Sequence, residues 1–281
     1  MGKVNLLDYR KEVYSSIGND GIIDFIFDKI GIDKSTFVEF GAWDGVKNSN
    51  CRNLFEKGWK GIFIESDKDK YKNLKNNYKD SDRVKYINRS INLKGENLFD
   101  NIVGPYIEEN IDFCSIDIDG LDLEVFETFE KCLPIVVCIE GGQMLSPYNK
   151  RVKKNISKKN IQQSLWVMVN SFEQKGYKVL CSYQDTFFVK KEFYNLFDVS
   201  NNILTLYFNG LRSIPRRMPF IQKYVNKVGL KNEIVDYILK KSNYRGYGWD
   251  KRKIWVREQS DYINELINEK EKIEKRKYEK N

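Results

Sequence analysis

Histidine is absent from this sequence of 281 residues, and no uninterrupted apolar run in it approaches the length of a membrane span. The lack of histidine excludes the commonest general base, the commonest side-chain metal ligand, and every Ser–His or Cys–His nucleophile. Any chemistry must therefore use carboxylates, lysine, tyrosine or a metal held by oxygen. Without about 18 consecutive apolar residues no transmembrane helix is expected, and Asp8 stands where a signal peptide would be apolar. We expect a cytoplasmic protein.

Cysteine is also scarce, and none of the five cysteines lies in a C-x-x-C pair. Cys114 and Cys138 fall inside apolar runs, so the pattern indicates neither a disulfide framework nor a zinc site. Buried thiols are expected instead.

Charge is distributed unevenly along the chain. The net charge of +8 comes entirely from residues 196–281, which hold 19 Lys and Arg against 11 Asp and Glu, whereas residues 1–195 hold 29 of each. The 41% of hydrophobic residues suffices for a full core. We therefore predict a neutral globular domain over 1–195 and a basic helical extension over 196–281, which serves as a lid or makes acceptor or oligomer contacts.

Seven short apolar runs, each bounded by charged or turn residues, predict strands. They cover 36–40, 61–64, 84–87, 111–116, 135–139, 177–181 and 186–189. Helix-like segments precede or separate them at 20–30, 47–57, 67–78, 96–109, 122–131 and 160–175. This alternation implies βαβ units and a doubly wound, mainly parallel α/β sheet. Only four residues, 182–185, separate the last two strands, so they are expected to form an antiparallel hairpin that closes the sheet at its edge.

The outer helices have signals of their own. Asn19 and Asp20 are interpreted as capping residues of the first helix and Gly31 as its end. Beyond about residue 196 the alternation stops, and helices are expected near 219–228, 231–242 and 253–277.

The first candidate site is FVEFGAWDG at 37–45, where an apolar strand leads into a glycine turn. A glycine directly after a parallel strand lets the backbone turn tightly and approach a ligand. Glu39, at the carboxyl edge of the strand, can pair with a cationic ligand group. Because bulky Trp43 lies between Gly41 and Gly45, the loop departs from G-x-G-x-x-G and disfavours pyrophosphate. A purely structural turn is the alternative.

A second strand ends in an acid, Glu65, some two dozen residues after Gly41. Doubly wound nucleoside-binding folds place a carboxylate on the ribose hydroxyls at this spacing, so Glu65 is the candidate ribose ligand. The alternative is a solvated charge at the end of a strand.

Carboxylates gather at the ends of two further strands. Asp117, Asp119 and Asp122 follow the strand at 111–116 within one turn, and Glu140 follows the neighbouring strand. Such a cluster is repulsive unless a cation or a shared proton intervenes, and oxygen ligands favour Mg²⁺, Mn²⁺ or Ca²⁺. Glu140 can complete a metal site or act as a base. The alternative is that Asp119 or Asp122 caps the next helix.

In this order, the segments resemble the FkbM-type methyltransferases over roughly residues 15–195. The matching pieces are NDGI at 19–22, FVEFGAWDG at 37–45, GWKGIFIE at 58–65, SIDIDG at 115–120, a strand ending in Glu140, and KGY at 175–177 leading to TFFVKK at 186–191. The resemblance implies a class I, seven-stranded methyltransferase fold with S-adenosylmethionine as donor. It also implies a hydroxyl acceptor on a sugar, a glycan or a related metabolite.

The resemblance assigns roles to individual residues. The methionine part of the donor would be held by Glu39, Gly41 and Gly45, the ribose by Glu65, the adenine edge by Asn88 to Ser90, and the inner side by Asp117. The other expected cofactor-binding residues are Ala42, Trp43, Asn48, Ser49 and Ser66.

The sequence departs from the family pattern at three places. Ser66 stands where many relatives have proline, GGQ at 141–143 replaces a Tyr-Asn-Pro-like segment, and the basic tail lies outside the shared domain. These departures concern the acceptor rather than the donor.

Catalysis on a hydroxyl needs activation, since an alcohol does not ionise unaided at pH 7. Without histidine, the expected device is Mg²⁺ or Mn²⁺ on Asp119 and Glu140, with Asp117 or Asp122, while a carboxylate takes the proton. The metal-free alternative uses Asp119 or Glu140 directly as the base. Asp117, Asp119 and Glu140 are thus the candidate catalytic residues.

Two rival functions and one acceptor class follow from other segments. Basic and aromatic residues at 244–255 favour RNA methylation, with a helical lid or oligomer interface as the alternative. A binding module that keeps the fold without turnover is the other rival. The lysines within 150–159 favour an anionic acceptor such as a charged glycan or phosphorylated sugar, or form only a solvated basic loop.

Overall fold

The fold is built on one seven-stranded sheet, which the computed structural model describes through residues 3–107, 110–143 and 162–213. The strands are β1 (Thr36–Phe40), β2 (Lys60–Ile64), β3 (Val84–Ile87), β4 (Phe113–Ile116), β5 (Val136–Glu140), β6 (Tyr177–Ser182) and β7 (Asp185–Lys190). Their order is β3-β2-β1-β4-β5-β7-β6. The first five are parallel, and β7 is antiparallel to both β5 and β6. The expected doubly wound, mainly parallel α/β sheet, with five parallel strands and an antiparallel closing hairpin, is confirmed.

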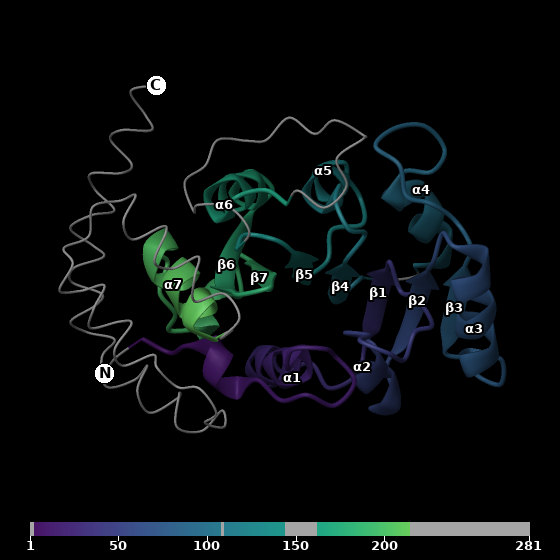
Figure 1. The fold of residues 1–281 in the computed structure, drawn as a ribbon, viewed down its shortest axis with the longest axis horizontal. Coiled ribbons are helices and arrows are strands. Elements are labelled where there is room, and N and C mark those ends of the chain that lie inside the picture. Colours follow the sequence, from purple (N-terminus) through teal and green to yellow (C-terminus); the bar gives the residue numbers. More distant parts are fainter. Residues whose placement is uncertain (1–2, 108–109, 144–161, 214–281) are drawn as a thin grey trace.

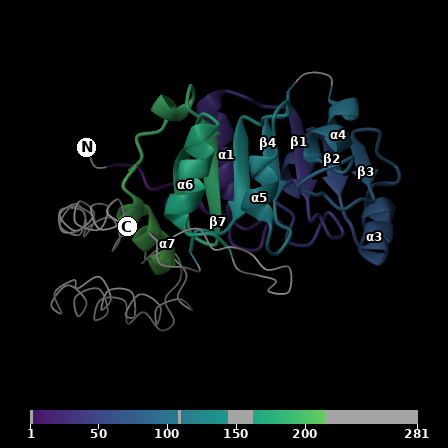
Figure 2. The same ribbon diagram turned by 90° about the horizontal axis from the view of Figure 1, so that it is seen from above.

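Helices cover both faces of the sheet (Figure 1). One face carries α4 (Phe99–Val103), α5 (Asp122–Glu127) and α6 (Leu165–Gln174), and the other carries α1 (Asn19–Ile30), α2 (Arg52–Glu56) and α3 (Lys68–Tyr78). Single 3-10 turns lie at Leu6–Tyr9, Gly104–Tyr106 and Tyr194–Leu196. Seen from above, α3 and α7 (Ile203–Ser213) lie at opposite ends of the described part of the protein (Figure 2).

Alternation along β1 divides the core into two halves. Val38 and Phe40 belong to the cluster under α4, α5 and α6, whereas Phe37 belongs to the cluster under α1, α2 and α3. Glu39 lies among these residues and is itself only 5% exposed. Because both faces of a parallel strand are covered, the run reads as almost continuously apolar, and a buried acid within it stands out.

Four helices are shorter than the sequence predicts. The segment at 47–57 contains only Arg52–Glu56, 96–109 contains Phe99–Val103 and a 3-10 turn, 122–131 contains Asp122–Glu127, and the described part of 160–175 contains Leu165–Gln174. In the first case Asn48 adopts a φ of 62°, which a right-handed helix does not permit. The loop after β1 is therefore longer than expected.

The capping interpretation of Asn19 and Asp20 is wrong. Gly18 is the N-cap of α1, and no side chain caps the helix. The carboxylate of Asp20 instead accepts hydrogen bonds from the backbone N–H groups of residues 13–15. The expected end at Gly31 is confirmed, since its N–H bonds to the carbonyl of Phe27. Asp20 thus binds the loop just before the helix, whereas Asn19 binds Asn50 and Asp185, partners 31 and 166 residues away that local sequence could not reveal.

Helix α7 was not expected, and it packs against the hairpin. A Cβ atom on Gly210 would lie 2.1 Å from the backbone oxygen of Ser182, so glycine lets the helix approach closely. Val4 forms a β-bridge with Val199, which ties the amino-terminal segment to the residues just before α7. The expected helices at 219–228, 231–242 and 253–277, the basic segment at 150–159 and the aromatic tail at 244–255 lie outside the described residues. No helix in the described part could cross a membrane.

Candidate functional site

A cavity of about 460 Å³ opens where the carboxyl ends of β1, β2 and β4 meet. It includes ten of the twelve residues expected to bind the donor, together with Asp119: Glu39, Gly41, Ala42, Trp43, Asn48, Ser49, Glu65, Ser66, Ser90 and Asp117. Carboxyl ends of parallel strands beside the central crossover form the usual ligand crevice of doubly wound folds. The structure thus brings together segments that are far apart in the sequence.

The turn at Gly41 is required by close packing of the backbone. Its φ is 76°, and a Cβ atom there would lie 1.6 Å from the carbonyl oxygen of Asp117. The close approach is to the turn after β4, so this glycine joins the two loops that line the cavity. Trp43 and Asn48 also have positive φ values, 54° and 62°, in the same loop. Non-glycine residues in this region carry strain, which concentrates at functional sites.

Glu39 anchors the loop after β1 from inside the protein. Its carboxylate accepts a hydrogen bond from the hydroxyl of Ser49 at 2.5 Å and another from the backbone N–H of Asn50 at 2.8 Å. Burial raises the pKa of Glu39 to about 7, against an ordinary value of 4.5, and these hydrogen bonds oppose the shift. The side chain holds the loop and contributes to the cavity wall at the same time.

Glu65, which directly follows β2, likewise anchors backbone segments around the cavity. One carboxylate oxygen accepts from the backbone N–H of Trp43 at 2.8 Å, and the other accepts from that of Asp67 at 2.7 Å. Each carboxylate oxygen has a further lone pair, so two hydroxyl donors can still bind. Glu65 therefore fixes the rim of the cavity and keeps capacity for a ligand.

Two residues that were expected to bind S-adenosylmethionine, Gly45 and Asn88, lie outside the lining of the cavity. A Cβ atom on Gly45 would lie 2.6 Å from side-chain atoms of Leu74 and Tyr78, so this glycine lets α3 pack against the loop. The side chain of Asn88 donates to the backbone oxygens of Glu65 and Ser66. Arg89, within the range expected at the adenine edge, lines the cavity, whereas sequence reasoning missed other lining residues, whose only signal is proximity to the motifs: Phe40, Lys47, Asn50, Ile64, Lys70, Ile91 and Ile118.

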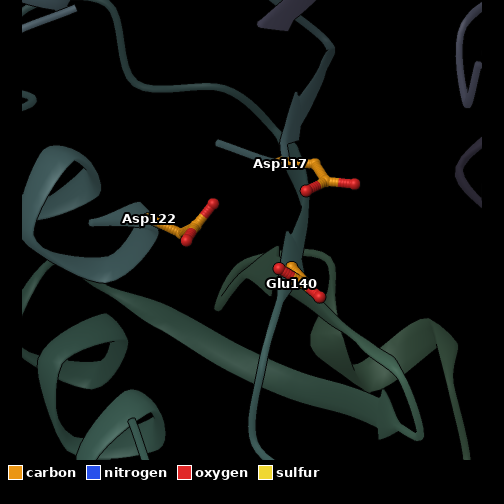
Figure 3. A group of neighbouring side chains, drawn as sticks. All are labelled: Asp117, Asp122 and Glu140. Atoms are coloured by element: carbon orange, nitrogen blue, oxygen red, sulfur yellow. The ribbon is translucent and has the colours of Figure 1, made fainter. Parts of the chain in front are cut away.

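A carboxylate cluster lies beside the cavity. One oxygen each of Asp117, Asp122 and Glu140 lies within 4.8 Å of the other two. The three side chains come from the ends of β4 and β5 and from the start of α5 (Figure 3). The group expected from the sequence was Asp119 and Glu140 with Asp117 or Asp122, whereas the structure brings together Asp117, Asp122 and Glu140 and leaves Asp119 out. Asp119, with φ of 57°, lines the cavity instead.

Asp122 is largely engaged by its own turn. Its two carboxylate oxygens accept from the backbone N–H groups of Ile118 at 2.7 Å and Gly120 at 2.9 Å. The N-cap position of α5 is Leu121, so Asp122 braces the turn before the helix. Asp117 and Glu140 are consequently the more available members of the cluster.

Proton affinity in the cluster is raised. Burial raises the pKa of Asp117 to about 8, although one side is open to the cavity, and the charges of Asp185 and Glu140 add to the shift. Burial likewise raises the pKa of Glu140 to about 7, and Asp122 and Asp185 contribute. Carboxyl groups that hold protons near pH 7 can act as bases or bind a cation in place of the proton.

Stability is expected to fall as the pH rises, because Glu39 binds its proton more tightly in the folded than in the unfolded chain. Below about pH 4.5 both states are protonated; between about 4.5 and 7 the unfolded state releases the proton first, so the free energy of unfolding decreases, and above about 7 it levels off. Urea unfolding at pH 5 and pH 8 should show a decline that is about 1–3 kcal/mol smaller in Glu39→Gln. An equal decline in both proteins would contradict the assignment.

Comparisons with known proteins concern the fold. No family profile and no curated protein sequence matches the chain. Among solved structures, it is similar to a SAM-dependent methyltransferase from Aquifex aeolicus (12% identity, TM-score 0.39, covering 65% of this chain and 89% of that chain). It is also similar to a putative caffeoyl-CoA O-methyltransferase from Staphylococcus aureus (15%, 0.43, 64% and 85%) and to a putative RNA methyltransferase from Pyrococcus horikoshii (13%, 0.40, 64% and 85%). The strand order itself carries the assignment of the fold, and no comparison confirms the FkbM-type resemblance.

Proposed function

We propose that this protein is an S-adenosylmethionine-dependent O-methyltransferase that acts on a sugar, a glycan or a related metabolite. The observation that carries the proposal is the cavity at the carboxyl ends of β1, β2 and β4, with Glu39, Glu65 and Asp117 in its lining. The donor bears a sulfonium and an ammonium group, and carboxylates in a partly buried cavity favour such cations. The volume of about 460 Å³ is typical of a small-molecule site.

The wall of the cavity suits the parts of the donor. Glu65 can accept hydrogen bonds from the ribose hydroxyls while its backbone contacts hold it in place. The carboxylate of Asp117 is exposed to the cavity, so it can pair with a positive charge there. When bound, S-adenosylmethionine would supply its methyl carbon to an acceptor oxygen: the new C–O bond forms in line with the breaking C–S bond, S-adenosylhomocysteine leaves, and the hydroxyl proton passes to a carboxylate. Alignment of the two molecules is therefore the main task of the protein.

The carboxylate cluster is the proposed place of acceptor activation. Asp117 and Glu140 can remove a proton from an acceptor hydroxyl, because their pKa values of about 8 and about 7 suit a base at neutral pH. The spacing of the three oxygens, within 4.8 Å of one another, also fits a divalent cation, since two oxygens bound at about 2.1–2.4 Å stand at most about 4–5 Å apart. Mg²⁺ or Mn²⁺ there would stabilise the developing alkoxide.

Calorimetry with S-adenosylhomocysteine tests the donor assignment. We expect binding with a Kd of about 1–100 µM, as for a metabolite in a preformed pocket. No heat with either S-adenosylhomocysteine or S-adenosylmethionine would favour a non-catalytic binding module. Turnover with glycan acceptors in excess chelator separates the two forms of activation: normal turnover there would exclude a metal at Asp117, Asp122 and Glu140 and leave a carboxylate as the base.

A further inference from the structure

Asn19, in the NDGI segment at 19–22, forms buried hydrogen bonds outside the lining of the proposed cavity. The side-chain amide of Asn19 donates to the side-chain oxygen of Asn50 at 2.8 Å and to the carboxylate of Asp185 at 2.5 Å. Its own oxygen accepts a hydrogen bond from the hydroxyl of Tyr183. Asn19 is 1% exposed and Tyr183 is fully buried, so water cannot replace these partners.

Asn50 continues the same network into the cavity wall. Its backbone N–H donates to Glu39 at 2.8 Å, and its side-chain amide donates to the hydroxyl of Ser115 on β4 at 2.9 Å. The side chain is only 7% exposed, yet it lines the cavity. One residue therefore joins the loop after β1 to the neighbouring strand and to α1.

The network spans the two halves of the proposed site. At one end, Asn50 and Ser49 bind the carboxylate of Glu39, which holds the loop at 41–50. At the other end, Asp185 is the first residue of β7 and is paired in register with Glu140 of β5. In a buried network each member depends on all its partners, because a lost partner leaves a buried polar group unsatisfied.

We propose that Asn19 and Asn50 are positioning residues that fix the donor-binding loop and the acidic end of β7 relative to each other. Neither residue needs to take part in chemistry. The inference rests on the proposed function for the ligands named in its test, but the coupling itself is a property of the protein without ligand.

Hydrogen exchange of the unliganded protein tests this coupling. In Asn19→Ala, exchange should become at least about tenfold faster in peptides covering both 41–52 and 183–186, since loss of one amide releases both ends. Ile26→Ala is the matched control: this buried residue lies about two helical turns along α1 and loses packing without touching the network. If Asn19→Ala does not fold, Asn19→Ser, which keeps one donor, is measured instead.

Ligand binding supplies a second readout that general destabilisation would not produce. The Kd for S-adenosylhomocysteine should rise about tenfold in the Asn19 variant, while that for 5′-methylthioadenosine, which lacks the amino-acid part, should change less than about twofold. Unchanged exchange at either end, or the same pattern in Ile26→Ala, would overturn the coupling. If the wild-type protein binds neither ligand, the proposed function fails, and exchange alone decides the inference.

Discussion

Replacing Gly41 by alanine is expected to abolish donor binding and to lower the free energy of unfolding by about 3 kcal/mol or more. The added Cβ atom would lie 1.6 Å from the carbonyl oxygen of Asp117, and this partner is backbone, so it cannot rotate away. The φ of 76° adds strain for any side chain. The turns after β1 and β4 must then separate, which disrupts the cavity between them. Urea unfolding and calorimetry with S-adenosylhomocysteine measure both effects.

Gly31→Ala is the control for this variant. Gly31 has nearly the same conformation, with φ of 81°, but nothing lies within 4 Å of the position its Cβ would take. Backbone strain alone should cost about 1 kcal/mol and leave the Kd unchanged. If the two variants lose equal stability, the contact with Asp117 is not what requires glycine at position 41.

Glu65→Ala is expected to weaken S-adenosylhomocysteine binding by about 100-fold or more. The change removes the proposed ribose ligand, and it also releases the backbone N–H groups of Trp43 and Asp67 that the carboxylate holds at 2.8 and 2.7 Å. The expected loss of affinity therefore combines the loss of a contact to the ribose with disorder at the rim of the cavity. Calorimetry measures the affinity, and circular dichroism checks that the sheet is retained.

Asp67→Ala is the control for this variant, because it removes another carboxylate only two residues away in the sequence. Asp67 also accepts two backbone hydrogen bonds, from Asp69 and Lys70, but as the N-cap of α3 it does not line the cavity. Its loss should lower stability only slightly and leave donor binding within about twofold. A similar loss of affinity in both variants would show that Glu65 acts by holding the turn after β2 and not by contacting the bound ligand.

The sheet was predictable because each strand carries its own signal. Buried parallel strands read as short apolar runs, and the four residues between the last two strands exclude a crossover helix. Helix ends were less predictable, since they depend on contacts made elsewhere. The polar residues Asn19 and Asp20 resemble a cap in the sequence, but they bind other segments.

The candidate site was predictable where a motif follows a strand. Glu65 and Asp117 line the cavity as the strand ends suggest. Asn50 could not be found this way, because its importance comes from partners 31 and 65 residues away in the sequence. The sequence likewise could not show that Asp117 rather than Asp119 lies with Asp122 and Glu140, nor that Asp119 adopts a φ of 57°. Such local geometry follows from tertiary packing and leaves no pattern in the sequence.

The bridge between Val4 and Val199 constrains the order in which this protein can fold during its synthesis. The backbone N–H of Val4 bonds to the carbonyl of Asp198, and the side chain of Lys3 bonds to the carboxylate of the same residue. Lys3 and Val4 can therefore find these partners only after residues 198 and 199 have been synthesised. Among the described strands, β7 comes last in the sequence and lies between β5 and β6, so the described sheet is also completed late. A nascent chain that stalls before β7 exposes an open strand edge at β5 and leaves Val4 without its bridge partner, and such an edge favours aggregation.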